Sequence, residues 1–310
     1  MTTPIAYWII FNLLIAIVLG IDLVRSYRSP HAMSVKEALL ASAGWIGLAL
    51  LFNGWIYWRF GSEPALAFFT GYLLEKSLSV DNLFVFLLIF AHFKVPETAK
   101  HHVLFCGVLG AIVMRALLIL GGIALTHQFE WIFLIFGVFL IITGARLAFK
   151  QESEAELETN RLYRYLKKTI PFTSYHGNRF FVLQNGGLFA TPLLAVLFLI
   201  EITDVIFAFD SVPAILGITQ DPFIAYTSNI FAVLGLRSLF FALQGVMGAF
   251  YLLHYALAFI LVFIGSKMLL APIVHIPIGI TFLVLVTTLF CGVAGSLLFP
   301  RKTSPPPRNP

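Results

Sequence analysis

Nine long apolar runs follow one another along this chain, and they set the main constraint on its fold. A helix needs about 20 apolar residues to cross a bilayer, and each run is close to that length. Of the 310 residues, 59% are hydrophobic and only 11% are charged, which leaves too little polar surface for a water-soluble protein. We therefore predict an all-α polytopic membrane protein with about nine transmembrane helices. The expected spans are roughly residues 5–24, 38–58, 65–91, 102–125, 130–149, 187–217, 223–250, 254–271 and 277–299.

The lysines and arginines indicate which way these spans run. If the N-terminus lies outside, 15 of the 20 basic residues fall on cytoplasmic loops or on the C-terminal tail, and two fall on the outer side. The remaining three lie within spans: Lys76, Arg115 and Arg237. Cytoplasmic loops of membrane proteins carry this kind of excess. We therefore predict an outer N-terminus and a cytoplasmic C-terminus.

One long polar segment, residues 151–184, divides the chain. It is acidic at its start and basic further on, which favours a short cytoplasmic helix within a linker between two halves. The predicted units are two N-terminal helices in 1–60, a first repeat half in 61–150, the loop 151–184, a second repeat half in 185–272, and a last helix with a disordered tail in 273–310. The net charge of +5 does not indicate nucleic-acid binding, because basic loops in a membrane protein reflect its orientation.

The two halves share a pattern of polar residues inside their spans. In each half two acids stand six residues apart, and an amide or a hydroxyl follows the second acid. These residues are Glu75, Asp81 and Asn82 in the third span, and Asp204, Asp210 and Ser211 in the sixth. The next span holds Arg115 in one half and Arg237 in the other. Unless the similarity is chance, a displacement of three spans predicts an inverted repeat of spans 3–5 and 6–8, as in many transporters.

Carboxylates in apolar spans are costly and indicate a functional site. With Glu201 included, five acids face three embedded bases, and the excess of two negative charges would suit one divalent cation. Carboxylate, amide and hydroxyl oxygens favour Mn²⁺, Mg²⁺ or Ca²⁺, and no Cys or His stands beside the acids to favour zinc or copper. The predicted metal ligands are Glu75, Asp81, Asn82, Glu201, Asp204, Asp210 and Ser211. The predicted charge-balancing residues are Lys76, Arg115 and Arg237.

A proline follows the second acid of the sixth span. Side chains six residues apart on a straight helix point about 120° away from each other, so a straight helix does not aim Asp204 and Asp210 at one point. Pro213 removes a backbone donor just after Asp210. We therefore predict a helix break at Pro213 that exposes carbonyl groups to the site.

Simpler roles stay open for several of these residues. The arginines could be structural ion-pair partners of the acids, although five acids exceed three bases. Lys76 could extend toward the membrane surface instead of joining the acids. Asp22 stands at the end of a span, where we expect it to be solvated.

Two long motifs resemble a known family. The segments "GYLLEKSLSVDNLFVF" and "EITDVIFAFDSVPAILGITQDPFIAYTSNIFAVLGLR" are similar to the TerC family, and to its Alx-type members most of all, as are "FIGSKML" and "HIPI" near the end. The resemblance covers nearly the whole chain apart from the loop. It implies a bacterial inner-membrane protein related to cation exporters, linked to tellurite resistance and metal homeostasis, and above all to manganese export. It also implies a metal path lined by Glu75, Asp81, Asn82, Glu201, Asp204 and Asp210.

Together these observations predict a transporter and not an enzyme. We expect it to export a divalent cation, Mn²⁺ in the first place, in exchange for protons, with the bilayer as its other partner and with no bound organic cofactor. The alternative is a non-transporting membrane scaffold or a stress-related redox modulator. Cys106 and Cys291 give that alternative little support, because both lie alone inside apolar runs and have no redox-motif spacing.

Overall fold

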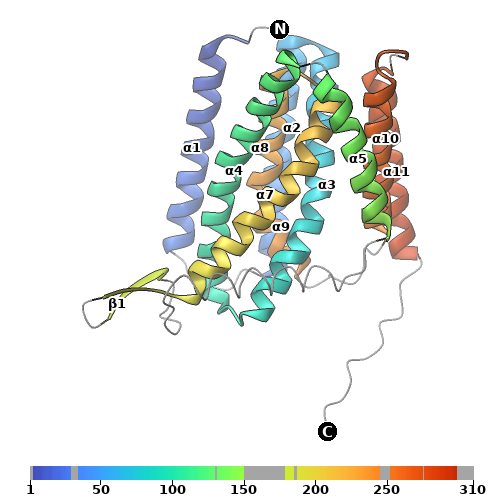
Figure 1. Cartoon of the computed structure of the whole chain (residues 1–310). Helices are drawn as coiled ribbons and strands as arrows, with labels where there is room; N and C mark the ends of the chain where they lie inside the picture. Colours follow the sequence, from blue (N-terminus) through green and yellow to red (C-terminus); the bar gives the residue numbers. More distant parts are fainter. Residues whose placement is uncertain are drawn as a thin grey trace.

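The described part of the chain forms a bundle of long helices with a small β-hairpin at one end (Figure 1). This computed structural model describes residues 3–28, 34–129, 131–149, 179–184, 187–244, 252–274 and 276–298. The helices are α1 (Ile5–Arg28), α2 (Val35–Phe60), α3 (Ser62–His92), α4 (Glu97–Gln128), α5 (Trp131–Phe149), α7 (Pro192–Ile218), α8 (Pro222–Leu234), α9 (Leu236–Leu243), α10 (Leu253–Leu270) and α11 (Ile278–Leu298). The strands are β1 (Phe181–Gln184) and β2 (Gly187–Ala190).

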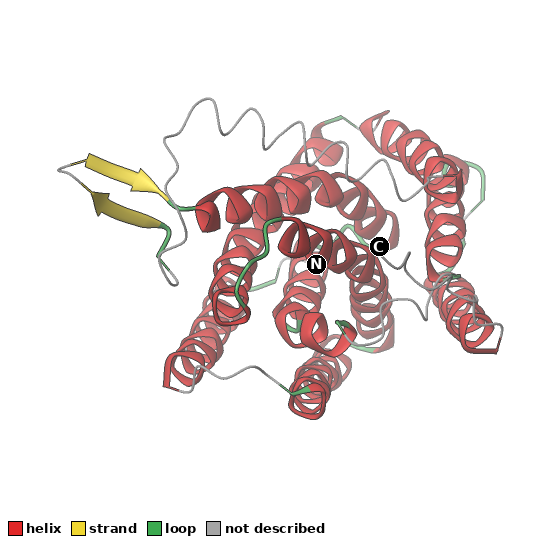
Figure 2. Cartoon of the chain, turned by 90° about the horizontal axis from the view of Figure 1, so that it is seen from below, coloured by secondary structure: helices red, strands yellow, loops and turns green. Residues whose placement is uncertain are grey.

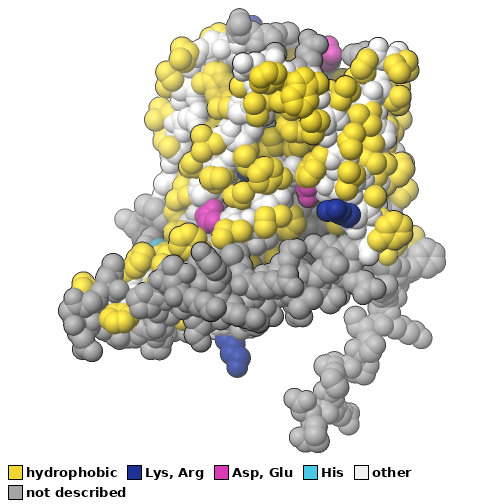
Figure 3. All heavy atoms as spheres, viewed as in Figure 1, with side chains coloured by type: hydrophobic (Ala, Val, Ile, Leu, Met, Phe, Trp, Pro, Cys, Tyr) yellow, Lys and Arg dark blue, Asp and Glu magenta, His cyan; other side chains and the backbone are white. Residues whose placement is uncertain are grey.

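The helices match the predicted spans. Seven of the described helices are long and apolar enough to cross a membrane, and α8 with α9 forms an eighth such unit across a 41° bend. Helix α3 has 31 residues, but every stretch of 18 residues within it holds three of the charges Glu63, Glu75, Lys76 and Asp81. The prediction of an all-α polytopic membrane protein is confirmed. On the face seen in Figure 3, hydrophobic side chains cover most of the bundle, as a lipid-facing surface requires.

The predicted sixth span began too early. Residues 187–190 belong to β2, which pairs with β1 so that Phe181 stands opposite Ala190. Helix α7 begins only at Pro192, because Thr191 is extended and proline favours the first helical position. The hairpin projects sideways from this end of α7 (Figure 2). Residues 151–178 of the predicted loop, and the predicted tail from residue 299 onward, lie outside the described part.

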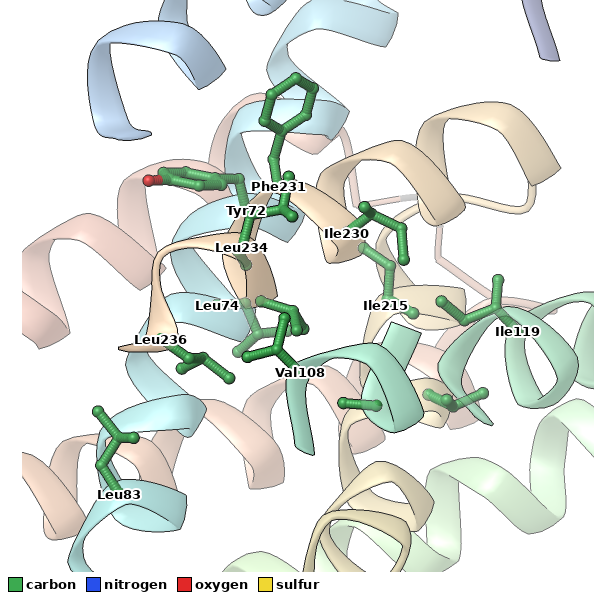
Figure 4. Packing of buried hydrophobic residues seen from close by; sticks show 14 of the residues in the cluster. Tyr72, Leu74, Leu83, Val108, Ile119, Ile215, Ile230, Phe231, Leu234 and Leu236 are labelled. Carbon is green, nitrogen blue, oxygen red and sulfur yellow. The ribbon is translucent and has the colours of Figure 1, made fainter. Parts of the chain in front are cut away.

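Helices α3, α4, α7 and α8 form the centre of the bundle. Their apolar side chains meet there, with Leu74, Ile119 and Ile215 each no more than 2% exposed (Figure 4). A second contact joins α5 to α10, where Gly137 and Gly265 face each other. A side chain on either glycine would strike the carbonyl oxygen of the other, at 2.9 and 2.5 Å respectively. Small residues at such crossings are typical of helix pairs in membranes.

The prediction of a helix break at Pro213 is wrong. Helix α7 continues from Pro192 to Ile218, and Pro213 lies inside it. All of its residues from Ser211 to Ile218 are buried, so packing keeps the helix continuous although one backbone hydrogen bond is missing. The break lies instead at Gly235, between α8 and α9. A Cβ there would stand 2.5 Å from Nζ of Lys76, so the glycine makes room for that side chain.

Candidate functional site

One arginine lies at the centre of the bundle. Arg115 of α4 is fully buried, and its guanidinium group reaches three other helices. Its Nη2 and Nε donate to the two carboxylate oxygens of Asp204 on α7, at 2.9 and 3.2 Å. Its Nη1 donates to Oε1 of Glu75 on α3. Such two-point contacts between a guanidinium and a carboxylate fix orientation as well as charge.

An asparagine closes the network. Asn229 of α8 accepts a hydrogen bond from Nη1 of Arg115 at 3.3 Å, and its Nδ2 donates to Oε2 of Glu75 at 2.9 Å. We call Glu75, Arg115, Asp204 and Asn229 the buried polar cluster. Each of the four is at most 3% exposed. With both carboxylates ionised, the cluster carries one more negative than positive charge.

Glycines let the four helices approach closely enough for these contacts. Gly71 lies one turn before Glu75, where a Cβ would strike Ile215 of α7 and come within 3.0 Å of Oγ of Ser228 on α8. Gly110 of α4 plays the same part for Glu201, because a Cβ at Gly110 would collide with the Glu201 carboxylate. Glu201 stands three residues before Asp204, so its partly buried carboxylate lies beside the cluster on the same helix.

The other predicted ligands are buried or partly buried, or their side chains lie outside the described part. Asn82 is 2% exposed, and Ser211 is buried with no hydrogen-bond partner for its Oγ among the described residues. Asp210 is partly buried. The side chain of Asp81 lies outside the described part. Among the described residues, no group of three or more His, Cys, Asp and Glu side chains is placed to hold a metal ion. In this conformation, Arg115 stands between the two most deeply buried of the described carboxylates, Glu75 and Asp204.

The second embedded arginine has a different partner. Nη2 of Arg237 on α9 lies 2.5 Å from Oδ1 of Asp22 on α1. The side chains are 11% and 25% exposed, so the expectation that Asp22 is solvated is wrong. Asp22 lies six residues before the end of α1, within reach of α9, and charge pairing offsets the burial of both groups.

Lys76 points away from the acids. Its Nζ donates to the carbonyl oxygen of Ala232 at 3.1 Å, in the last turn of α8 beside the break at Gly235. The break leaves carbonyl groups at this helix end without their usual donors, and a cation there also suits the helix dipole. Lys76 therefore caps α8 from inside the bundle and does not extend to the membrane surface.

A small pocket lies between the cluster and Arg237, with room for little more than a water molecule. It is lined by Phe86 of α3, Leu104, Gly107, Val108 and Ala111 of α4, Ile200 and Asp204 of α7, and Leu236 and Arg237 of α9. The α4 residues precede Arg115 in sequence, so the pocket lies on the side of the cluster where α4 begins. Asp204 and Arg237 thus face one enclosed space.

Sequence reasoning missed Asn229 as a member of the site. It lies inside an apolar span, eight residues before Arg237. A signal was present, because an amide inside an apolar helix needs a buried partner. The neighbouring Tyr226 has a similar role, since its hydroxyl donates to Oδ1 of Asn12 on α1 at 2.6 Å.

Comparison with known proteins agrees with this architecture. Residues 60–304 match the model of the integral membrane protein TerC family. The chain is 48% identical over 300 residues to the "Putative membrane-bound redox modulator Alx" of Escherichia coli K12, covering 92% of this chain and 93% of that one. It is 44% identical over 292 residues to the membrane protein STKORF319 of Myxococcus xanthus, covering 94% and 92%.

A more distant relative shows the same coverage. A membrane protein of Rickettsia bellii is 40% identical over 292 residues, covering 94% of this chain and 97% of that one. No solved structure matches the chain. The match to the family model spans most of the chain, and the relatives align from end to end. The chain is a multi-pass membrane protein that belongs to the TerC family.

Proposed function

We propose that this protein is a transporter, not an enzyme, that exports Mn²⁺ from the cytoplasm in exchange for protons. It would lie in the inner membrane of a bacterium, with its N-terminus outside and its C-terminus in the cytoplasm. The supporting observation is the buried polar cluster, in which Glu75 and Asp204 from two helices share the guanidinium of Arg115. Buried carboxylates in membrane helices are costly and typically mark a binding site for a transported ion or a proton.

Charge balance supplies the mechanism. Glu75 and Asp204 each need a positive partner at this depth, and in this conformation Arg115 serves both. An arriving divalent cation would take its place on the carboxylates and displace the guanidinium. Glu201, one turn from Asp204, and the Asn229 carbonyl offer further oxygen ligands of the kind that Mn²⁺ accepts. Arg115 would then return to the acids after the cation leaves.

Protons would provide the exchange. A carboxylate that loses its cation at this depth is stabilised either by a guanidinium or by a proton. Five acids face three bases inside the spans, so Arg115 alone cannot neutralise every acid after the metal has left. Proton uptake by the remaining acids would couple the outward metal step to a pH gradient.

The test uses purified protein in vesicles that contain a Mn²⁺-sensitive dye. Glu75→Gln and Asp204→Asn each remove one charged ligand worth about 1.5–3 kcal/mol, which predicts a loss of initial flux of about tenfold or more. Glu97→Gln is the matched control, because Glu97 is about half exposed and pairs with Lys100 in the first turn of α4, 18 residues before Arg115. Equal flux in the parent and both cluster variants would contradict the assignment. Absence of flux in the parent under every pH gradient would contradict transport itself.

The printed name of the Alx relatives favours a second candidate, a modulator of membrane redox state. In this chain such a function would fall to Cys106 on α4, which is partly buried, and Cys291 on α11, which is exposed; neither is in a disulfide. The double variant Cys106→Ser with Cys291→Ser separates the two candidates. If the variant loses the effect of the protein on cellular redox state but keeps Mn²⁺ flux, both functions are present. If it changes neither, redox modulation by thiols is excluded.

A further inference from the structure

Helix α1 is attached to the broken span on both sides of the break. On α8, the hydroxyl of Tyr226 donates to Asn12 at 2.6 Å. On α9, Arg237 pairs with Asp22 at 2.5 Å. The two α1 residues are ten positions apart, about 15 Å along a helix, and the break at Gly235 lies between their partners. Helix α1 therefore contacts the broken span on both sides of the bend.

The two attachments differ in what surrounds them. Around Asn12, rings hold α1 to α8: Trp8 lies against Phe223 with centroids 5.4 Å apart, and Phe11 lies against Phe231 at 5.7 Å. These contacts anchor the first half of α1 firmly. At the other attachment, Arg237 contacts α1 through its ion pair with Asp22. This ion pair joins α9 to α1, while α9 packs mainly against α2.

The guanidinium of Arg237 is only half satisfied in this position. Its Nη1 is buried and has no hydrogen-bond partner among the described residues. A buried donor without a partner costs about 1–3 kcal/mol, so the closed arrangement is held without a large excess of stability. A state held in this way is suited to repeated opening.

Arg237 also lines the enclosed pocket that reaches Asp204. Its neighbour Leu236, at the start of α9, lines the same pocket. Movement of α9 about Gly235 would therefore withdraw both side chains from the pocket wall. That would open the space between Asp204 and the end of the bundle where α4 begins.

We propose that the Asp22–Arg237 ion pair is the latch of a gate formed by α9, hinged at Gly235, which closes the approach to Asp204. This proposal rests on the proposed transport function and assigns its inner gate. While the latch is closed, the pocket holds little more than a water molecule. When Arg237 leaves Asp22, α9 turns away and water and cations reach the buried polar cluster from the side on which α4 begins.

Water access can be measured without any transport assay. In a background of Cys106→Ser and Cys291→Ser, Ala111→Cys places one thiol in the pocket wall. A small, charged methanethiosulfonate, present on both sides of a vesicle membrane, modifies that thiol only where water reaches it. Ala111 is 4% exposed, so we expect slow modification in the latched protein.

Breaking the latch should speed this modification. Asp22→Asn, and independently Arg237→Gln, should raise the rate about five- to tenfold, because the open state gains population when the ion pair is lost. The charge swap Asp22→Arg with Arg237→Asp should restore the slow rate. Glu97→Gln, which breaks an ion pair within α4, is the control that should not change it. If neither single variant alters the rate of thiol modification, or if the charge swap does not restore the slow rate, the Asp22–Arg237 ion pair is not the latch.

Flux measured in the same vesicles separates the two proposals. A latch-dependent modification rate without Mn²⁺ flux in the parent would keep the gate and overturn the proposed cargo. Normal Mn²⁺ flux with modification rates that ignore the latch would keep the transport function and overturn the gate.

Discussion

Arg115 and Arg237 stand at matching positions in the two predicted repeat halves, yet their surroundings differ. Arg115 is fully buried and engages two carboxylates and an amide from three other helices. Arg237 has one acid, Asp22, from a helix outside the repeat, and one of its nitrogens has no partner among the described residues. Arg115 therefore links the central helices of the bundle, whereas Arg237 lies beside the break between α8 and α9. Similar sequence patterns at matching positions have produced a buried network of several partners in one half and a single ion pair in the other.

The strongest way to sharpen this comparison is to remove the central arginine. Arg115→Gln leaves Glu75 and Asp204 buried without a cation, and we expect it to lower the free energy of unfolding by about 3–5 kcal/mol. Thermal unfolding of the purified protein in detergent measures the effect. Arg146→Gln on α5, whose side chain is exposed, is the control and should change stability by less than about 0.5 kcal/mol. Equal stability of the two variants would show that the contacts of Arg115 do not stabilise the bundle.

The neutral member of the cluster should matter next. Asn229→Ala removes the partner of one Glu75 oxygen and one contact of Arg115, which predicts a loss of about 1–3 kcal/mol. The neighbouring Ser228→Ala serves as the control, because its hydroxyl bonds only the carbonyl of Ala225 in its own helix, at 3.1 Å. The same unfolding assay compares them. If Ser228→Ala costs as much, the amide bridge adds nothing specific.

The second arginine should be the less costly of the two to remove. Arg237→Gln breaks a partly exposed ion pair and relieves a buried donor that has no partner, so we expect a loss of about 1 kcal/mol or less. A loss as large as that of Arg115→Gln would make the two arginines equivalent after all and would contradict the contrast between them. The variant should keep its fold while pocket accessibility rises, a pattern that general destabilisation does not produce.

The third embedded base is expected to have the smallest effect. Lys76→Met keeps most of the side-chain volume and loses one hydrogen bond to Ala232, while it removes the cost of burying an ammonium group. Replacement of a buried charge by an apolar group of similar size is often close to neutral, so we expect a change below about 1 kcal/mol. Lys76→Ala, which leaves a cavity beside Gly235, should cost more in the same assay. If Lys76→Met lowered stability more than Lys76→Ala, the charge of Lys76, and not its packing, would stabilise the protein at the break.

Much of the architecture could be predicted because it depends on local properties of the sequence. A run of apolar residues of sufficient length becomes a span whatever its neighbours are, so the helices lie where hydropathy placed them. Helix α8 begins at Pro222, one residue before the predicted span, where Asp221 accepts hydrogen bonds from the backbone of Phe223 and Ile224. The inverted relation between the two halves stays a prediction.

The contacts of the site depend on how helices cross, which no local pattern states. Glu75 and Asp204 were predicted ligands, but their spacing in the sequence does not show that Arg115 lies between them. It also does not show that Arg237 pairs with Asp22. The misplaced break has the same origin. Proline weakens a helix anywhere, but the buried packing around Pro213 keeps α7 continuous. The break lies at Gly235, where the side chain of Lys76 needs room.

The charges of α3 also govern how the chain enters the bilayer. Each charged residue near the middle of a helix opposes insertion by roughly 2.5–3.5 kcal/mol, and α3 carries Glu75, Lys76 and Asp81 within seven positions. The groups that bind Glu75 come later in synthesis, Arg115 with α4 and Asn229 with α8. We therefore expect α3 to leave the translocon together with α4 and to settle only once α8 has been made. A chain that ended before α8 would leave Oε2 of Glu75 without the hydrogen bond from Asn229, inside a helix that already opposes insertion.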